Sequence, residues 1–311
     1  MKNFDELLTA VREEEPRRVS VAAANDPASV EALSMAASED LATGVLVGDS
    51  GKINKIASGL GIDLGDIEVI HEPDDIAAAR KSVALVSGGK ADIAMKGHIH
   101  TDDFLRAVLD RDVGLRSGNV MSHVFIVEME DRLLLVTDGA MNIGPDVVQK
   151  AEIVLNAVHL AHILGVGRPR VAALAAVELV NPKMVATMDA GALNTMWSRG
   201  QFSPDFIMDG PLAMDDAISP EAAARKGIGG PVAGRADILL VPAIEDGNIL
   251  TKALIHVAGR RAAGVLIGAA APVVITSRAD SPETKMLSIA TAVLTSNVKR
   301  RLRLKIGKVH F

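Results

Sequence analysis

The sequence has no cysteine and no tyrosine, and tryptophan occurs only once among its 311 residues. Without cysteine the chain cannot form disulfides, bind a metal through thiolates or use a thiolate nucleophile. Because only six phenylalanines are present, aliphatic side chains must fill the core, and an apolar content of 49% is enough for a large one. We therefore predict a folded globular protein of about two domains.

Strong basic charge and long membrane-like segments are also missing. The formal net charge is −6, and stacking aromatic residues are scarce, which argues against a nucleic-acid partner. The longest apolar stretch, 262–276, is too short for a membrane span and is interrupted by glycines and a proline. The N-terminus is too polar for a signal peptide, so we expect a cytoplasmic protein with no membrane contact. We interpret the basic run at 299–305 as the charged end of a helix.

Short apolar runs alternate with helical patterns along the chain, which is typical of an α/β fold with parallel strands. The runs in the first part are 19–24, 45–47, 67–70 and 93–95. Two extended runs, 120–129 and 133–136, indicate an antiparallel hairpin. We expect two α/β domains, formed by residues 1–115 with 276–311 and by residues 116–275, and a ligand cleft at their junction.

The stretch 271–283 has the clearest pattern for a site. An apolar run, 273–276, is followed by Ser277 and Arg278, and then by Ser281, Pro282 and Glu283, which are typical of a helix start. The runs 263–271 and 273–276 both suit inner strands of a parallel sheet. Open α/β sheets bind ligands at the carboxyl ends of their strands, and helix N-termini favour anions. The alternative interpretation is a simple turn with a solvated arginine.

A second polar strand end lies at 95–102. Lys96 follows an apolar strand, Gly97 allows close approach of the backbone, and the helix that follows carries Arg106. This combination could hold an anion. His98 and His100 could suggest a metal, but no carboxylates complete a ligand set, and we expect no metal there.

Carboxylates mark two further turns. Asp138 and Asn142 follow the second strand of the hairpin, where they could act in a site or could cap local backbone amides. Asp209, Asp215 and Asp216 lie in a glycine-proline turn and could bind Mg²⁺ or act as acid and base. The alternative there is a turn that ends in a helix N-cap.

Read together, several of these motifs resemble the phosphate acetyltransferase and phosphate butyryltransferase family, and the butyryl branch more closely. The matching blocks occur in family order and cover about two-thirds of the chain. They are 95–97, 101–106, 135–142, 175–178, 181–183, 209–212, 219–221, 231–234, 236–242, 247–249 and 276–278.

The resemblance implies an architecture like that of isocitrate and isopropylmalate dehydrogenases, with two α/β domains, a central cleft and a homodimer. It also implies the reaction acyl-CoA + phosphate ⇌ acyl phosphate + CoA, through a ternary complex without a covalent acyl-enzyme. CoA would then be a substrate, and no tightly bound cofactor or metal is expected. The acyl-chain preference cannot be read from the sequence.

The family's serine-arginine pair falls on Ser277 and Arg278. By resemblance, the serine would stabilise the leaving thiolate or the tetrahedral oxyanion, and the arginine would bind phosphate. We add Asn142 and Asp138 to the expected catalytic residues. The expected substrate-binding residues are Lys96, Arg106, Arg116, Thr137, Asp209 and Glu283.

The chain departs from the acetyltransferase pattern at two positions. Thr284 stands where acetyltransferases have an aspartate thought to be the base, and a family arginine falls near His256. Lys96, Arg106 or Arg116 could supply the missing cation. Two alternatives therefore stay open. One is an NAD-dependent decarboxylating hydroxy-acid dehydrogenase with Mg²⁺ at the carboxylate turn, and the other is a non-catalytic sensor of CoA esters.

Overall fold

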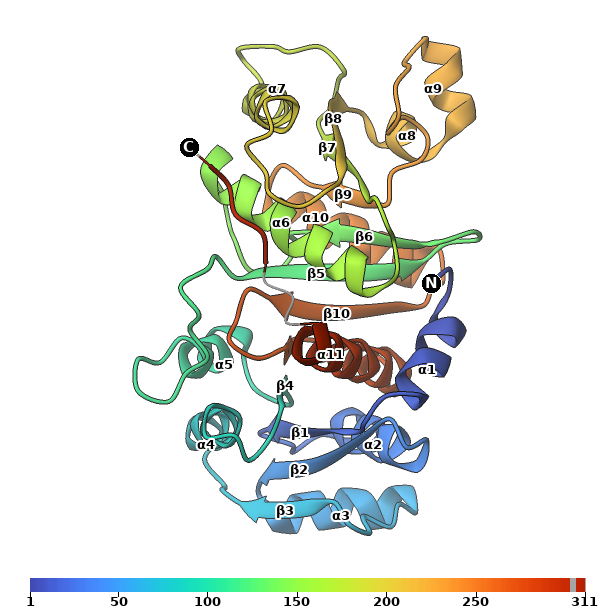
Figure 1. Ribbon diagram of the computed structural model, residues 1–311. Coiled ribbons are helices and arrows are strands. Elements are labelled where there is room, and N and C mark those ends of the chain that lie inside the picture. The colour runs from blue at the N-terminus through green and yellow to red at the C-terminus, as the bar shows by residue number, and fades with distance from the viewer. Residues whose placement is uncertain (303–305, 311) are drawn as a thin grey trace. The chain divides into compact units, whose positions relative to one another are not determined.

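The computed structural model describes residues 1–302 and 306–310, which form two compact units (Figure 1). The N-terminal unit contains residues 4–119 and 262–302, and the central unit contains 1–3, 120–261 and 306–310. The sequence placed 262–275 in the second domain and the last residues in the first. The structure assigns 262–275 to the N-terminal unit, because β11 pairs with β4. It assigns 306–310 to the central unit, because Val309 bridges to Phe202. The side chains of the basic run at 299–305 lie outside the described residues.

The N-terminal unit is built on strands in the order β3-β2-β1-β4-β11-β10. Their bounds are β1 (Arg17–Ala22), β2 (Ala42–Gly48), β3 (Glu68–His71), β4 (Ile93–Lys96), β10 (Ala262–Ile267) and β11 (Val273–Val274). The helices of this unit are α1 (Phe4–Arg12), α2 (Pro27–Ser38), α3 (Ser50–Leu60), α4 (Asp75–Ser87), α5 (Thr101–Val108) and α11 (Pro282–Leu302). The predicted alternation of strands and helices is confirmed.

Aspartates begin the helices that follow β1, β2 and β3. Asp26, Asp49 and Asp74 occupy the N-cap positions of α2, α3 and α4, and each side chain accepts a hydrogen bond from a backbone N–H in the first turn. These bonds satisfy donors that the start of a helix leaves unpaired. As a result, three helix N-termini lie at the carboxyl edge of the parallel strands.

The strand order reverses between β1 and β4. The chain moves outward from β1 to β3 and returns through α4 to β4 on the other side of β1. Ligands of open α/β sheets bind at the carboxyl ends of strands at such a switch point. Gly97, directly after β4, donates its backbone N–H to Ala22 O, and a Cβ there would lie only 2.5 Å from that oxygen.

The prediction of two long parallel inner strands near the C-terminus was wrong in part. β10 ends at Ile267 and runs antiparallel to β11, while β11 has only two residues and pairs parallel with β4. The segment 268–272 forms a loop instead, and its Ala270 donates a backbone hydrogen bond to Leu115. An apolar run does not state the direction of its strand, so the sequence could not distinguish these cases.

The central unit has the strand order β5-β6-β9-β7-β8. Its strands are β5 (Ser122–Glu128), β6 (Leu133–Thr137), β7 (Arg170–Leu174), β8 (Ile207–Leu212) and β9 (Ile238–Leu240). Its helices are α6 (Val147–Ile163), α7 (Val185–Ser198), α8 (Met214–Ile218), α9 (Pro220–Lys226) and α10 (Ile244–Lys252), followed by the π-helical turn η1 (Ala253–Val257). The predicted hairpin is confirmed, since β5 and β6 pair antiparallel.

Aliphatic side chains form the core, as the shortage of aromatic residues predicts. In the central unit, Leu134, Val136 and Leu239 pack with residues from β7 and β8 and are fully buried. Among the helices in the described part of the chain, none combines the length and the apolar character needed to cross a membrane.

The close packing at Gly97 gives a stability prediction. In Gly97→Ala the new methyl group would meet backbone oxygens of Ala22 and Ala23, which cannot move without disturbing β1. We expect a loss of about 1–3 kcal/mol in the free energy of unfolding, measured by urea denaturation. Gly59→Ala in α3 is the control, because nothing lies within 4 Å of its added Cβ, and it should be neutral or stabilising. Equal stability of the two variants would contradict this account.

Candidate active site

The turn between β11 and α11 carries the predicted serine-arginine pair. Ser277 and Arg278 are both exposed, and Ser281 caps the helix by accepting the backbone N–H of Thr284 at 3.1 Å. The Ser277 backbone N–H donates to Asp280 Oδ2 at 2.6 Å, while the Ser277 carbonyl accepts from the Asp280 backbone N–H. These bonds confirm the predicted helix start and hold the turn in one shape.

Arg278 lies at a cavity of about 480 Å³ within the N-terminal unit. The cavity is lined by Pro73, Asp74, Asp75, Ile76, His98, Ile99, His100, Asp103 and Arg278. Arg278 Nη2 lies 2.9 Å from His100 Nδ1, and because a guanidinium can only donate, that ring nitrogen must accept. His100 therefore orients Arg278, a role that the sequence did not suggest.

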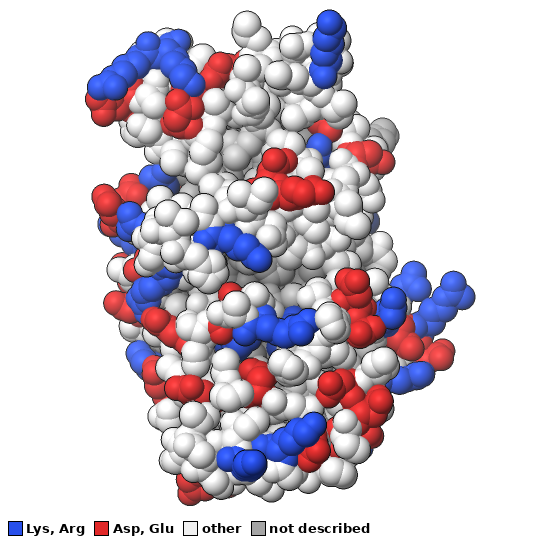
Figure 2. Space-filling model, turned by 180° about the vertical axis from the view of Figure 1, so that it is seen from behind, with Lys and Arg blue, Asp and Glu red and all other residues white. Residues whose placement is uncertain are grey.

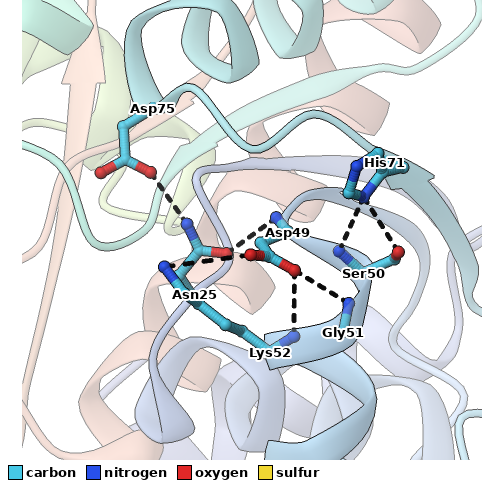
Figure 3. A network of polar contacts seen from close by, with 7 residues as sticks. All are labelled: Asn25, Asp49, Ser50, Gly51, Lys52, His71 and Asp75. Atoms are coloured by element: carbon cyan, nitrogen blue, oxygen red, sulfur yellow. Dashed lines mark hydrogen bonds and ion pairs between the residues drawn. The ribbon is translucent and has the colours of Figure 1, made fainter.

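A polar network joins the carboxyl ends of β1, β2 and β3 and includes Asp75, which lines this cavity (Figure 3). Asn25 accepts the Asp49 backbone N–H at 3.0 Å and donates to Asp75 Oδ1 at 2.8 Å. Ser50 contacts His71 Nδ1 through both its backbone nitrogen and its hydroxyl. Since Asp75 also lines the cavity, this network fixes one of its walls.

Lys96 ends β4 and is almost fully buried, with 2% of its surface exposed. Its ammonium donates to the carbonyls of Gly97 at 3.3 Å and Ile99 at 3.1 Å. Burial, followed by the positive charges of Lys285 and Arg278, lowers the pKa of Lys96 from 10.5 to about 8. Lys96 and Arg278 are thus brought together at the ends of two adjacent strands.

Lys285, in the first turn of α11, is a residue that the sequence reasoning missed. Its side chain is buried and donates to Thr276 Oγ1 and to the Ser277 carbonyl. The local sequence gives little signal, because Lys285 follows Glu283 and Thr284 in the polar first turn of α11. A lysine on a helix is normally expected at the surface.

The other predicted cations of this unit lie outside the cavity lining. Arg106 is exposed and forms an ion pair with Asp103 at 2.8 Å, and Arg116 is also exposed. Asp103 lines the cavity, so Arg106 contacts its rim through that carboxylate. Glu283 is exposed in the first turn of α11.

Asp138 and Asn142 organise a loop in the central unit. Asp138 accepts the backbone N–H groups of Ala140, Met141 and Asn142, and it accepts the Asn142 side-chain amide at 2.6 Å. The same amide also donates to the Met121 carbonyl. Both carboxylate oxygens of Asp138 and the amide group of Asn142 are therefore engaged within the loop.

Thr137 and Asp209 have local partners as well. The Thr137 hydroxyl donates to the His123 carbonyl at 3.0 Å and is fully buried. Asp209 lies within β8, and its carboxylate accepts the backbone N–H of Gly210. The predicted site residues are thus divided between the two units.

Lys226 binds the carboxylates that the dehydrogenase alternative would use for Mg²⁺. Its ammonium lies 3.0 Å from Asp215, 3.1 Å from Asp216 and 3.1 Å from Glu178. The hydrogen bond with Asp216, and then the one with Lys226, lowers the pKa of Glu178 to about 2. Burial and the hydrogen bond with Glu178 raise the pKa of Asp216. Asp216 is consequently the group that keeps a proton most readily in this cluster.

On the face shown in Figure 2, Lys and Arg side chains are interspersed with Asp and Glu. Within residues 1–302 and 306–310, no three His, Asp or Glu side chains come together in a way that could hold a metal ion.

The cluster at the ends of β4 and β11 combines three cations with an exposed hydroxyl. Lys96 and Lys285 are buried, Arg278 is exposed at the cavity, and Ser277 precedes it. The buried ammonium groups donate to neutral oxygens, and the nearby carboxylates Asp26 and Asp280 influence them less than burial does, so positive charge is available to attract an anion. This arrangement is suited to holding a phosphate beside a group that could stabilise an oxyanion.

Comparison with known proteins points to the same chemistry. Residues 74–293 match the family model described as phosphate acetyl/butaryl transferase. A phosphate butyryltransferase of Clostridium acetobutylicum is 48% identical over 301 residues, which are 96% of this chain and 100% of that protein. A phosphate acetyltransferase of Rhizobium meliloti is 42% identical over 96% of this chain and 94% of its own length.

Solved structures agree with the fold. A branched-chain phosphotransacylase from Enterococcus faecalis has a TM-score of 0.80 and 33% identity, with 90% of this chain and 99% of that chain covered. A 4-hydroxythreonine-4-phosphate dehydrogenase from Klebsiella pneumoniae has a TM-score of 0.53 at 14% identity, over 90% of this chain and 99% of its own. The second similarity concerns the fold alone, and both structures agree with the predicted α/β fold.

The Lys226 cluster gives a prediction about stability and pH. Lys226→Gln removes the only cation of this group and leaves three carboxylates close together. Without Lys226 the negative charges of this cluster repel one another at pH 7, whereas protonation near pH 4, which begins at Asp216, relieves the repulsion. We expect the variant to lose thermal stability at pH 7 and to approach the wild type near pH 4. Arg225→Gln, which breaks an exposed pair with Glu221, should have little effect at either pH, and a loss at pH 7 no larger than this control would contradict the account.

Proposed function

The chain belongs to the phosphate acetyl/butyryl transferase family, and we propose that Ser277 and Arg278 form the centre of its reaction. The protein is a phosphate acyltransferase, which transfers acyl groups between CoA and inorganic phosphate. The observation that carries our proposal is the group of three cations beside an exposed serine at the ends of β4 and β11. This positive charge favours binding of a phosphate dianion over binding of any uncharged nucleophile.

The proposed step is a direct attack of phosphate on the thioester carbonyl. A P–O oxygen forms a bond to the carbonyl carbon, the C–S bond breaks, and the CoA thiolate takes up a proton. Arg278 would hold the phosphate, which lowers the cost of bringing it to an anionic partner. The Ser277 hydroxyl would donate to the developing oxyanion or thiolate.

We propose Lys96 as the group that transfers the proton in this step. Thr284 cannot act as a carboxylate base, and its hydroxyl accepts a hydrogen bond from Ser281. Lys96 is the titratable group of the cluster whose pKa, about 8, lies nearest to neutrality. In its ammonium form, which also attracts phosphate, Lys96 can donate a proton to the leaving thiolate and can then take up the proton of the attacking phosphate.

We propose that the cavity beside Arg278 receives part of the acyl-CoA. Three of its lining residues are aspartates, Asp74, Asp75 and Asp103, which would repel the phosphates of CoA. The uncharged pantetheine arm suits this lining better, because its amides can donate to carboxylates. In this arrangement the thioester end of the arm would approach Arg278 and Ser277.

The remaining predicted residues take supporting roles in this proposal. Asp138 and Asn142 would act by shaping their loop, because their polar groups are already engaged. Arg106 and Arg116 are exposed and would contact the charged end of CoA. The proposed assembly is a homodimer, and the proposed location is the cytoplasm, where CoA esters and phosphate are both available.

No observation in the described residues favours the dehydrogenase alternative. Asp215 and Asp216, which it needs for Mg²⁺, bind Lys226 instead. The sensor alternative would keep CoA binding without turnover. Release of free CoA from acyl-CoA separates these possibilities, because only the transferase needs phosphate for that release.

A kinetic experiment on Arg278 tests the proposal. With butyryl-CoA and acetyl-CoA as substrates, thiol release by the wild type should require phosphate and form acyl phosphate in equal amount. Arg278→Ala should raise the KM for phosphate and lower turnover by about two orders of magnitude, as loss of one such donor usually does. Arg225→Ala is the control, since Arg225 forms an exposed pair remote in sequence from the site. Near-normal kinetics of Arg278→Ala would refute the role of the arginine.

The lowered pKa of Lys96 leads to a prediction about pH. Below about pH 8 its ammonium is charged and can attract phosphate, and above that pH the charge is lost. The KM for phosphate should therefore rise as the pH increases from 7 to 9, a range in which phosphate itself is increasingly the dianion. Lys96→Met should have a high KM already at pH 7 and should no longer show this rise. A wild-type KM that stays constant up to pH 9 would exclude Lys96 as the titrating group.

A further inference from the structure

Three lysines of the described chain are fully or almost fully buried, and one of them differs from the other two. Lys150 lies 2.6 Å from Asp189, so its charge is paired. Lys96 and Lys285 instead donate to carbonyl and hydroxyl oxygens. Burial of an ammonium group without a carboxylate is costly, and folding alone does not account for two such groups at neighbouring strand ends.

Lys285 reaches from α11 to the end of β11. Its Nζ donates to Thr276 Oγ1 at 3.0 Å and to the Ser277 carbonyl at 2.9 Å, while only 1% of the residue is exposed. These two partners directly precede Arg278 in the chain. The ammonium therefore holds the backbone from which both proposed reactive side chains extend.

Lys285 also changes the charge around Lys96. The charged groups that face Lys96 are Lys285 from α11, Arg278 and Asp280 from the β11–α11 turn, and Asp26 from the start of α2. Lys285 is the strongest of these influences and is repulsive. Asp26 and Asp280 act in the opposite direction but more weakly.

We propose that Lys285 is a positioning residue of the phosphate site, which anchors the Ser277–Arg278 turn and adds its positive charge to those of Arg278 and Lys96 where the anion binds. This inference rests on the proposed acyl transfer to phosphate. Lys285 acts in it through Ser277, Arg278 and Lys96, and it does not itself touch the substrate. The phosphate dianion then supplies the negative charge that the protein leaves out.

The absence of cysteine makes a sharp experiment possible. In Lys285→Cys the new thiol is unique in the chain, so the unfolded variant can be alkylated with 2-bromoethylamine and refolded. Alkylation restores a side chain with the length and charge of lysine, whereas iodoacetamide gives a neutral one. The wild type, treated in the same way, controls for refolding. Lys55→Cys controls for the chemistry, because Lys55 is exposed on α3.

We expect Lys285→Cys to raise the KM for phosphate and to lower kcat, with a combined loss of up to about a hundredfold in kcat/KM for phosphate. Aminoethylation should recover most of this loss, and carbamidomethylation should not. The KM for acyl-CoA should change little. Lys55→Cys should keep wild-type kinetics in all its forms.

A pH profile separates this role from a purely structural one. In Lys285→Gln the amide can still donate to the same oxygens, but the charge is gone. Because the repulsion on Lys96 is then relieved, the pH above which the KM for phosphate rises should shift upward. A structural role would lower the amount of folded protein without moving that pH.

The following outcomes would contradict the proposed role of Lys285. Wild-type kinetics of Lys285→Gln at every pH, or equal recovery by the neutral and the charged alkylation, would overturn it. If neither variant folds while the aminoethylated chain does, Lys285 serves stability and the inference is wrong. If the wild type itself releases no CoA with phosphate, the proposed function fails first, so the two failures are distinguishable.

Discussion

Buried positive charge at the ends of β4 and β11 is the constraint on which the N-terminal unit depends. Lys96 and Lys285 are almost fully shielded from water, and their hydrogen bonds go to neutral oxygens. Such charge is tolerable when backbone carbonyls are fixed in the right positions and when an anion completes the site. The requirement for fixed carbonyls explains the many hydrogen bonds within the surrounding turns.

The fold provides these fixed positions through ordinary rules of α/β architecture. The reversal of strand order at β1 and β4 places loops from several strands at one edge, and aspartate N-caps fix the helices that follow them. Gly97 lets the chain after β4 pass within contact of the β1 backbone. His100 then orients Arg278 from the neighbouring loop. Each element contributes one contact to a site that none of them forms alone.

Much of this arrangement could be predicted from local sequence. Alternating apolar and helical segments indicated the α/β class, and the residues around Pro282 indicated a helix start directly after Ser277 and Arg278. Features that depend on tertiary partners could not be predicted. The direction of β10 was one, because an apolar run pairs in either direction, and the partner oxygens of Lys285 were another. For Asp138, a carboxylate before glycine suits both a catalytic and a capping role, and its bonds to the backbone N–H groups of Ala140 and Met141 could not be read from the sequence.

The central claim is that an inorganic anion binds where the turn after β11 meets the end of β4. A crystal structure of the wild-type protein grown with phosphate tests this claim most directly. Our account predicts phosphate within hydrogen-bonding distance of Arg278 and Ser277, with Lys285 still donating to the Ser277 carbonyl. Phosphate bound elsewhere, with the Arg278 guanidinium directed into solvent, would contradict it.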